Sequence, residues 1–390
     1  MSKLLFVYDH FYPAYKAGGP IQSLTNLATC LQDKHEISGF TGSKDHNSSE
    51  KLLNTDTDKW TETKLPGAGK NLPVWYASQG TITKQLFSNI VKATKPAVIY
   101  LNGIFSYRFV IIPLLSVDRS KYKLIIAPRG MLQSGALAGK AAKKKLYLAM
   151  LKLSGLVRSV SWHATNEEER EDIIKVFGKK AKVTVASNIP KRPVNEISFP
   201  GKKPGGLRLV YLSLVAEKKN LLGLIELVNR SAAGITLDIY GPVKDEAYWK
   251  KCIQAIGNDN LKITYRSDLR PELVQETFAK YDASILLTKG ENFGHALYES
   301  LSAGRPIITS FFTPWNGLEE KKAGWNLDIS NQDECISKLE MIANLDSGSF
   351  NAYCSGAYAL AKAYYDKTAD LDGYDKLFGS AAEYSTHPQP

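Results

Sequence analysis

The chain has 390 residues, of which 44% are hydrophobic and 23% are charged, and its net charge is +11. This composition is ordinary for a globular protein, so it excludes a disordered, collagen-like or coiled-coil chain, and the length favours two to three domains. No apolar run reaches the roughly 18 residues of a membrane span. Asp9 follows the start too closely for a secretory signal, so we expect a cytoplasmic protein. The four cysteines lack C-x-x-C spacing, which predicts neither a zinc site nor a disulfide framework.

Short apolar runs alternate with amphipathic helical patterns along the first half of the chain. Leu4 to Tyr8 is typical of a buried strand, and a helix is expected to open after Gly18-Gly19, with Pro20 well placed in its first turn. Further strands are expected at 97–101, 123–127 and 182–186. The stretch 188–206 is rich in Pro, Gly and Lys and lacks periodicity, so we interpret it as a linker.

The same alternation restarts after this linker. Strands are expected at 207–215, 235–240, 262–266, 283–288 and 306–310, and helices at 220–229, 245–256, 271–281 and 295–302. Strand–helix alternation predicts parallel sheets covered by helices on both faces, so we expect an α/β protein with two doubly wound domains. Ligands of such sheets bind beyond the carboxyl ends of the strands, and with two domains the expected place is the cleft between them.

The loop after the strand at 283–288 has the strongest chemical pattern. It reads GENFG at 290–294, and Glu299 follows in the next helix. The glycines let backbone approach a ligand closely, and free N–H groups at a helix start can hold an anion such as a diphosphate. Glu291 would then reach hydroxyls beyond the phosphates, and Glu299 could accept two hydrogen bonds from a vicinal diol. The alternative is a solvated loop glutamate and a surface helix glutamate.

Other strand-end loops give weaker signals. Lys218 and Lys219 stand at the mouth of a strand–helix turn, a typical place for a phosphate contact, although two solvated lysines would give the same pattern. The Gly18-Gly19 pair could present backbone N–H groups to phosphate, whereas a lone histidine such as His10 is more often structural than catalytic. The run Thr-Pro-Trp at 313–315 could line a pocket or simply pack.

These runs together resemble a known family. The segment 290–299 is similar to the glutamate–seven residues–glutamate signature of family 4 retaining glycosyltransferases. Runs at 13–20, 213–220 and 303–306 match that family in order and spacing, and those at 241, 313–315 and 323–325 resemble a subgroup common in bacterial polysaccharide and lipopolysaccharide synthesis. The resemblance spans roughly residues 4 to 330.

The resemblance implies a GT-B fold, in which two Rossmann-like domains face an interdomain cleft. It implies an acceptor-binding domain at 1–190, a nucleotide-sugar-binding domain at 205–357, and a final helix at about 358–390 that packs back on the first domain. The implied activity is retaining transfer of a hexose-type sugar from a UDP- or GDP-linked donor to a glycan or lipid-linked acceptor. Neither a metal nor any other cofactor is expected.

The resemblance also assigns roles by position. Glu291 would be the catalytic contact to the transferred sugar, and Glu299 would bind the ribose diol. The other donor-binding residues implied are Gly19, Lys218, Lys219, Asn292, Phe293 and Gly294. Two departures qualify the match: Leu214 stands where many relatives carry a phosphate-binding arginine, and no histidine occurs at 127–131. Arg129 and His10 are the candidates for a phosphate or acceptor contact on the first domain.

Positive charge is concentrated between Arg119 and Arg158, where ten Lys or Arg residues occur and no Asp or Glu. Within this region, residues 139–152 form a basic amphipathic pattern, with lysines 140, 143, 144 and 145 towards one side. Each lysine near an anionic lipid surface contributes about 1 kcal/mol. The segment 140–152 could therefore hold the protein peripherally at the inner membrane face; a solvated helix face is the alternative.

Four other functions fit the sequence less well. Asp56-Thr57-Asp58 has the form of the metal motif of GT-A transferases but lies in a polar stretch, and no GxGxxG follows a strand as in a nicotinamide dehydrogenase. A basic nucleic-acid-binding protein would interleave aromatic side chains with its charges, and this charged region does not. A GT-B nucleotide-sugar epimerase shares the fold and is the alternative enzyme.

Overall fold

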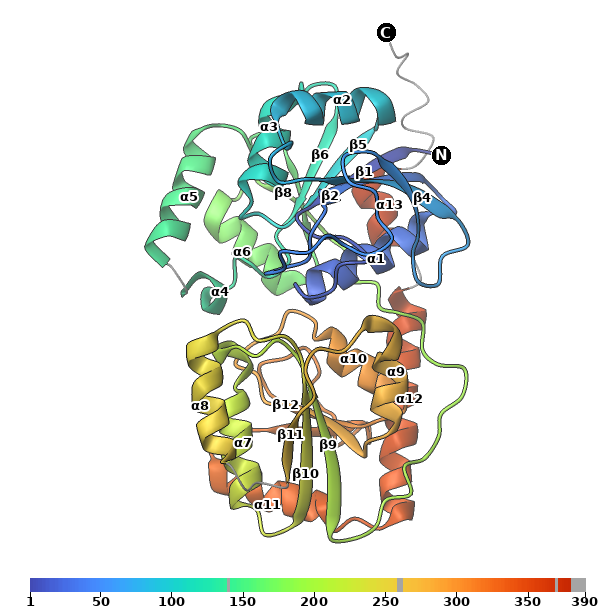
Figure 1. Ribbon diagram of the computed structural model, residues 1–390, viewed down its shortest axis with the longest axis vertical. Coiled ribbons are helices and arrows are strands. Elements are labelled where there is room, and N and C mark those ends of the chain that lie inside the picture. Colours follow the sequence, from blue (N-terminus) through green and yellow to red (C-terminus); the bar gives the residue numbers. More distant parts are fainter. Residues whose placement is uncertain (139–140, 258–261, 369–370, 380–390) are drawn as a thin grey trace. The chain divides into compact units, whose positions relative to one another are not determined.

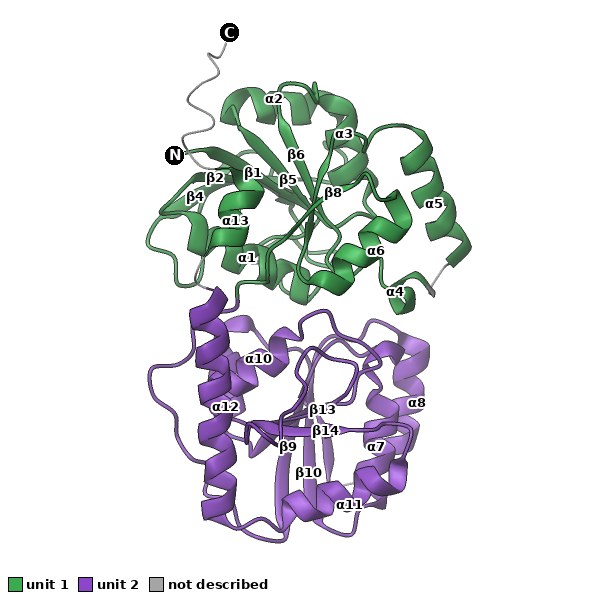
Figure 2. Cartoon of the chain, turned by 180° about the vertical axis from the view of Figure 1, so that it is seen from behind, with its two compact units in different colours: residues 1–189, 370–390 green, residues 190–369 purple. Residues whose placement is uncertain are grey.

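The computed structural model describes residues 1–138, 141–257, 262–368 and 371–379, and it divides the chain into two compact units (Figure 2). Unit 1 takes residues 1–189 and the C-terminal segment from 370, and unit 2 takes residues 190–369. The sequence predicts that the N-terminal domain ends at residue 190, and the first segment of unit 1 ends at residue 189.

Over the described residues of unit 1, eight strands form one sheet in the order β3-β4-β2-β1-β5-β6-β7-β8 (Figure 1). All neighbours pair in parallel except β3 with β4. The strands are β1 (Lys3–Tyr8), β2 (Glu36–Gly42), β3 (Trp60–Lys64), β4 (Asn71–Ala77), β5 (Val98–Asn102), β6 (Lys123–Ala127), β7 (Ser161–Ala164) and β8 (Lys182–Val185).

Helices cover both faces of this sheet, as expected for strands connected by crossover helices. They are α1 (Gly19–Leu31), α2 (Lys84–Thr94), the π-helix η1 (Tyr107–Ile111), α3 (Ile112–Ser116), α4 (Ser134–Ala138), α5 (Ala141–Leu153), α6 (Glu167–Phe177) and α13 (Asp372–Phe378). Alternate residues of a strand point to opposite faces, so Leu4 and Phe6 of β1 pack in one hydrophobic core and Leu5 and Val7 in another.

Within the described part of unit 2, six parallel strands form a second sheet in the order β11-β10-β9-β12-β13-β14. The strands are β9 (Gly206–Leu212), β10 (Gly234–Tyr240), β11 (Ile263–Tyr265), β12 (Ala283–Leu286), β13 (Ile307–Ser310) and β14 (Gly324–Leu327). The helices are η2 (Glu217–Lys219), α7 (Leu221–Arg230), α8 (Glu246–Ile256), η3 (Pro271–Leu273), α9 (Val274–Ala279), α10 (His295–Ser302), α11 (Gln332–Ala343) and α12 (Ser347–Thr368). The predicted pair of doubly wound α/β units is confirmed.

The C-terminal helices differ from the expectation of one returning helix at 358–390. Helix α12 belongs to unit 2 and packs along α10, because Phe350, Cys354 and Ala361 are buried in the core of that unit. Only the short α13 packs on unit 1, where Tyr374 and Phe378 join its core. The remainder of the expected helix, 380–390, lies outside the described residues.

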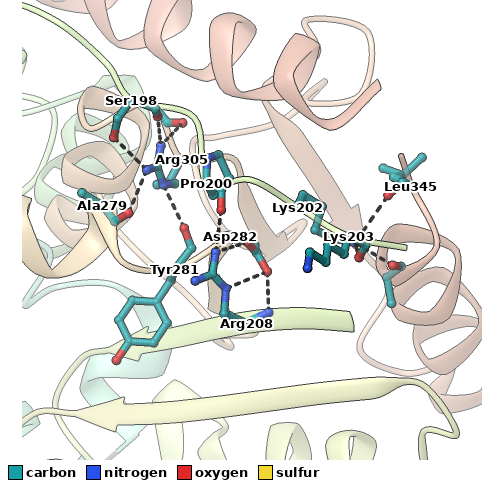
Figure 3. Close-up of polar contacts among 12 residues, drawn as sticks. Ser198, Pro200, Lys202, Lys203, Arg208, Ala279, Tyr281, Asp282, Arg305 and Leu345 are labelled. Carbon is teal, nitrogen blue, oxygen red and sulfur yellow. Dashed lines mark hydrogen bonds and ion pairs between the residues drawn. The ribbon is translucent and has the colours of Figure 1, made fainter. Parts of the chain in front are cut away.

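The predicted linker is also different, because residues 190–205 are bound to unit 2 as an extended strap (Figure 3). The guanidinium of Arg305 is almost fully buried and donates to the backbone oxygen of Ser198 at 2.6 Å. Arg208 forms an ion pair with Asp282 at 2.8 Å and also donates to the Pro200 oxygen at 2.9 Å. These cations satisfy carbonyl groups that an irregular segment leaves unpaired, so the strap needs no periodic sequence to be held.

Candidate active site

Three loops at the carboxyl edge of the unit 2 sheet are joined by backbone hydrogen bonds. The carbonyl of Lys218, in the loop after β9, accepts from the Lys289 amide at 2.8 Å, in the loop after β12. The Glu291 amide donates to the carbonyl of Phe312, in the loop after β13, at 2.9 Å. The parallel topology brings these strand ends to one edge, as predicted, and the hydrogen bonds set the loop that carries Glu291 against its two neighbours.

Glu291 forms an ion pair with Lys219. Only 12% of the Glu291 side chain and 19% of the Lys219 side chain are exposed, so both charges are largely withdrawn from water. Glu291 is therefore not the solvated loop glutamate of the alternative reading. An ammonium–carboxylate pair in such surroundings is stronger than one on an open surface, since solvent screens it less.

Lys218 lies beside this pair. A Cβ on Gly290 would come within 3.2 Å of the Lys218 Cε, so glycine at this position lets the loop and the lysine stem lie close together. Burial lowers the pKa of Lys218, and the nearby Glu291 carboxylate opposes that shift. The structure thus brings together Lys218, Lys219 and Glu291, which the sequence pattern had placed in two separate loops.

The start of α10 is shaped by Gly294, which precedes its first residue. Gly294 has φ +79°, in the left-handed region that glycine adopts without strain, and no side chain caps the helix. The first N–H groups of a helix have no partner within it. Asn292 and Phe293 lie in the bend that leads into this helix start. The role of this end of α10 in holding an anion stays a prediction.

Glu299 lies in α10 and only 5% of it is exposed. It is not the surface helix glutamate of the alternative reading. Its carboxylate lies within the packing around α10, and its contact with a ribose diol stays a prediction.

An aromatic cluster packs around Phe293, in the loop that carries Glu291. Phe293 is buried, and its carbonyl accepts a hydrogen bond from the indole N–H of Trp315 at 2.6 Å. The two rings lie 5.5 Å apart edge to face, and Tyr298 and Tyr364 pack against both. Of the two readings of the Thr-Pro-Trp run, packing is confirmed. The sequence did not reveal the contact between the loops of Phe312 and Glu291; the only signal was an aromatic residue in a strand-end loop.

Two further predicted residues lie in unit 1. Gly19 is the first residue of α1, preceded by Gly18 at φ +78°, and no side chain caps this helix either. His10 follows β1; its Nδ1 lies 3.2 Å from the Lys44 carbonyl oxygen, and its ring lies edge-on to His46. Its neighbour Asp9 has a raised pKa because it is buried, although a hydrogen bond from Ser106 opposes the shift.

Arg129 has surroundings that differ from the expected phosphate or acceptor contact. Its guanidinium is buried and donates to the side-chain oxygens of Asn102 at 2.7 Å, Asn188 at 2.6 Å and Tyr100 at 2.7 Å. These three bonds use three of the five N–H donors of the guanidinium, and through Asn188 they fix the end of unit 1's first segment to its sheet. The contact of Arg129 with a phosphate or acceptor stays a prediction.

A cavity of about 350 Å³ lies along α7 in unit 2. Its lining comes from η2, α7, α8, α11 and the loop after β12, and it includes Glu217 and Lys289 but not Glu291 or Glu299. Because neither of the two glutamates lines this cavity, we do not assign the donor to it. Among the described residues, no group of three or more His, Cys, Asp or Glu side chains is placed to hold a metal ion.

The predicted basic segment forms α5, except that residues 139–140, with Lys140, lie outside the described part. The sequence predicts lysines towards one side of this helix, but in the structure apolar side chains are exposed together with the lysines. Leu146 and Met150 are each 63% exposed and Leu153 is 82% exposed, alongside exposed lysines at 143, 145 and 152. Leu148 and Leu151 instead attach the helix to the core of unit 1. In the described residues, none of the helices has the length and apolarity needed to span a membrane.

Comparisons with known proteins show similarity to glycosyltransferases in sequence and in fold. Residues 194–345 match the sequence model of the family described as glycosyl transferases group 1. The GtfA subunit of the UDP-N-acetylglucosamine–peptide N-acetylglucosaminyltransferase of Streptococcus gordonii is 23% identical over 189 residues. That alignment covers 46% of this chain and 36% of the relative, so the chain spans about a third of that protein.

Solved structures match nearly the whole chain. Sucrose-phosphate synthase from Thermosynechococcus elongatus is 14% identical with a TM-score of 0.74, covering 98% of this chain and 100% of that one. HepE from Anabaena, solved with UDP and glucose, is 14% identical with a TM-score of 0.69, covering 97% and 99%. WaaG, a glycosyltransferase of lipopolysaccharide biosynthesis, is 14% identical with a TM-score of 0.62, covering 99% and 100%.

The structural matches establish the fold as GT-B, as the sequence predicts. Residues 194–345 of unit 2 are similar to the glycosyl transferases group 1 family, and this similarity confirms the resemblance found in the sequence.

Proposed function

We propose that the protein transfers a hexose-type sugar from a UDP- or GDP-linked donor, with retention of configuration, to a glycan or lipid-linked acceptor of surface-polysaccharide synthesis. The observation that carries the proposal is the pair of largely buried carboxylates, Glu291 and Glu299, on either side of the glycine-bearing start of α10, with Lys218 and Lys219 beside Glu291. Buried acids next to cations and an uncapped helix start suit a ligand that combines hydroxyls with a diphosphate.

Each part of the donor has a matching group in this arrangement. The carboxylate of Glu299 offers paired acceptors for the two ribose hydroxyls, and Glu291 offers them to the transferred sugar. The N–H groups at the start of α10, in the turn of Asn292, Phe293 and Gly294, suit the diphosphate, and the lysines of η2 add positive charge. The contributions of Gly19 and His10 stay predictions.

The proposed chemistry breaks the bond between the anomeric carbon and the diphosphate oxygen, and the acceptor hydroxyl oxygen forms the new bond on the same face. The leaving diphosphate takes the proton of that hydroxyl, so charge and atoms balance without a metal. The protein's part is to stabilise the charge that grows on the leaving diphosphate, through positively charged and N–H groups fixed in advance.

The relatives support the choice of donor and pathway. HepE was solved with UDP-glucose, which supports a UDP-linked sugar. WaaG acts in lipopolysaccharide biosynthesis, which supports a surface glycan as the product. Leu214 stands where many relatives carry a phosphate-binding arginine. We propose that Lys218 supplies this positive charge in addition to Lys219, since Lys218 lies against the loop that carries Glu291.

Peripheral membrane contact through α5 is part of the proposal. Leu146, Met150 and Leu153 recur at helical spacing and are exposed together with lysines, a composition typical of helices that lie in a membrane interface. We propose an anionic membrane at the inner face as the partner, because lipid-linked acceptors would be presented there and the lysines match its charge.

The test begins with thermal-shift screening against UDP-, GDP- and ADP-linked sugars, since a ligand that binds only the folded state raises the unfolding temperature. We expect one nucleotide to respond, and then transfer of its labelled sugar to a glycan or lipid-linked acceptor with the anomeric configuration kept. Conversion of the sugar without any acceptor would instead identify an epimerase. A protein that responds to none of these donors would contradict the proposal.

A further inference from the structure

The two groups assigned to different parts of the donor hold each other in this structure. Lys219 is the lysine expected at the diphosphate, and Glu291 is the carboxylate expected at the sugar hydroxyls, yet the Lys219 ammonium is paired with the Glu291 carboxylate. An ammonium that donates to this carboxylate must at least share its hydrogen bonds when a phosphate oxygen arrives, because it has only three N–H donors.

The charges around this pair give it a part in the proposed donor site. Lys218, Lys219 and Lys244 lie near one another. Burial lowers the pKa of Lys218, the charges of Lys219 and Lys244 lower it further, and Glu291 raises it. Glu291 therefore neutralises part of a cluster of lysines. The same negative charge would repel a diphosphate brought to Lys219, because both are anions and the side chains are largely buried, where solvent screens the repulsion weakly.

We propose that the Lys219–Glu291 pair is a latch that the donor's diphosphate opens. Building on the donor site proposed above, the phosphate takes the Lys219 ammonium from Glu291, and this exchange frees the carboxylate to accept hydrogen bonds from the sugar hydroxyls. The diphosphate then has to engage before the sugar is gripped. A bare nucleoside diphosphate opens the latch without replacing the lost partner of Glu291, whereas a nucleotide-sugar replaces it with hydroxyl groups.

The latch makes an unusual prediction: removing the negative charge of a donor-site residue should strengthen the binding of a sugar-free nucleotide. Glu291→Gln keeps the shape of the side chain and releases Lys219. Because a hydrogen bond to a charged group contributes about 1.5–3 kcal/mol, we expect calorimetry to show UDP, GDP or ADP, whichever binds, about tenfold tighter in this variant. The same variant should lose the preference of the wild-type protein for the nucleotide-sugar over the bare nucleotide.

Glu217→Gln is the matched control. Glu217 is an exposed glutamate in η2, next to Lys218, and its replacement removes the same unit of negative charge as Glu291→Gln. We expect it to change the affinity for the bare nucleotide by no more than about twofold, as is usual for exposed charges. In a Lys219→Met background, Glu291→Gln should no longer strengthen binding, since the latch is already broken. Glu291→Ala serves in the same role if the glutamine variant is not recovered.

Equal or weaker nucleotide binding by Glu291→Gln would overturn the latch while leaving the donor site in place. Equal strengthening by Glu217→Gln, or by Glu291→Gln in the Lys219→Met background, would also overturn it, because the effect would then be general electrostatics. Binding by Glu291→Gln alone, with none by the wild-type protein, would support it strongly. If none of the three nucleotides binds either protein, the donor site fails and the latch fails with it.

Discussion

The proposed role of Glu299 can be tested by changing its carboxylate in the protein and the ribose hydroxyls in the ligand. Glu299→Gln keeps the volume of a side chain that is only 5% exposed, so the packing around α10 should be retained. The variant replaces a charged group with two acceptor oxygens by a neutral amide with one. Losing hydrogen bonds to a charged partner costs about 1.5–3 kcal/mol, so the dissociation constant for the nucleoside diphosphate should rise about 10- to 100-fold.

The assay is calorimetric titration with two ligands, the nucleoside diphosphate and its 2′,3′-dideoxy analogue. The wild-type protein should prefer the natural nucleotide, and Glu299→Gln should lose that preference while binding the dideoxy analogue as the wild-type protein does. The ligand change thus separates a lost hydroxyl contact from a general disturbance of the site. If the variant binds both ligands equally less well, or if neither affinity changes, Glu299 does not hold the ribose diol and our reading of the signature is wrong.

Four further outcomes are expected. Donor transfer should persist in EDTA, and a strict requirement for Mg²⁺ would contradict the metal-free chemistry. Arg129→Met should leave three buried oxygens without their donor and lower the unfolding temperature of unit 1, with little change in nucleotide affinity measured by calorimetry. Burial, together with the nearby charge of Arg129, lowers the pKa of His163 from its usual 6.5 to about 3, so between these pH values the unfolded chain binds more protons than the folded one. The free energy of unfolding should therefore fall as the pH drops through this range. His163→Gln should flatten this pH dependence in thermal unfolding measured at a series of pH values. Sedimentation with vesicles containing phosphatidylglycerol should show binding that weakens several-fold in a Leu146→Ser/Met150→Ser double variant, whereas equal binding by both proteins would remove α5 from the membrane contact.

The regular elements of unit 2 were predictable because their patterns are local. The expected helix at 295–302 has the bounds of α10, and the strand expected at 235–240 differs from β10 by one residue. The central strands of a parallel sheet are buried on both faces and read as continuous apolar runs. In unit 1, β2 reads EISGFTG and mixes polar residues and glycine into a buried strand, so no such run marked it.

The non-local features could not be predicted in this way. The strap at 190–205 has no pattern of its own. Arg305 and Arg208, from elsewhere in unit 2, donate to its carbonyl groups, and Lys202 of the strap donates to the Ala343 carbonyl. Lysine and arginine in a charged, proline-rich region suggest solvated side chains, yet Lys202 is buried and donates to the Ala343 carbonyl at 2.6 Å. Buried cations of this kind are recognised only when the carbonyl groups around them are known.

The sequence by itself determined the fold class, the positions of the two glutamates that flank the start of α10 and the resemblance to a glycosyltransferase family, because periodicity and motif spacing are properties of neighbouring residues. The tertiary structure decided which charges meet. It paired Lys219 with Glu291 across 72 positions of the chain, buried Glu299, and placed Arg129 among amide and phenol oxygens. The physical reason is that the energy of a charge depends on its distance from other charges and from water, and the folded chain sets both.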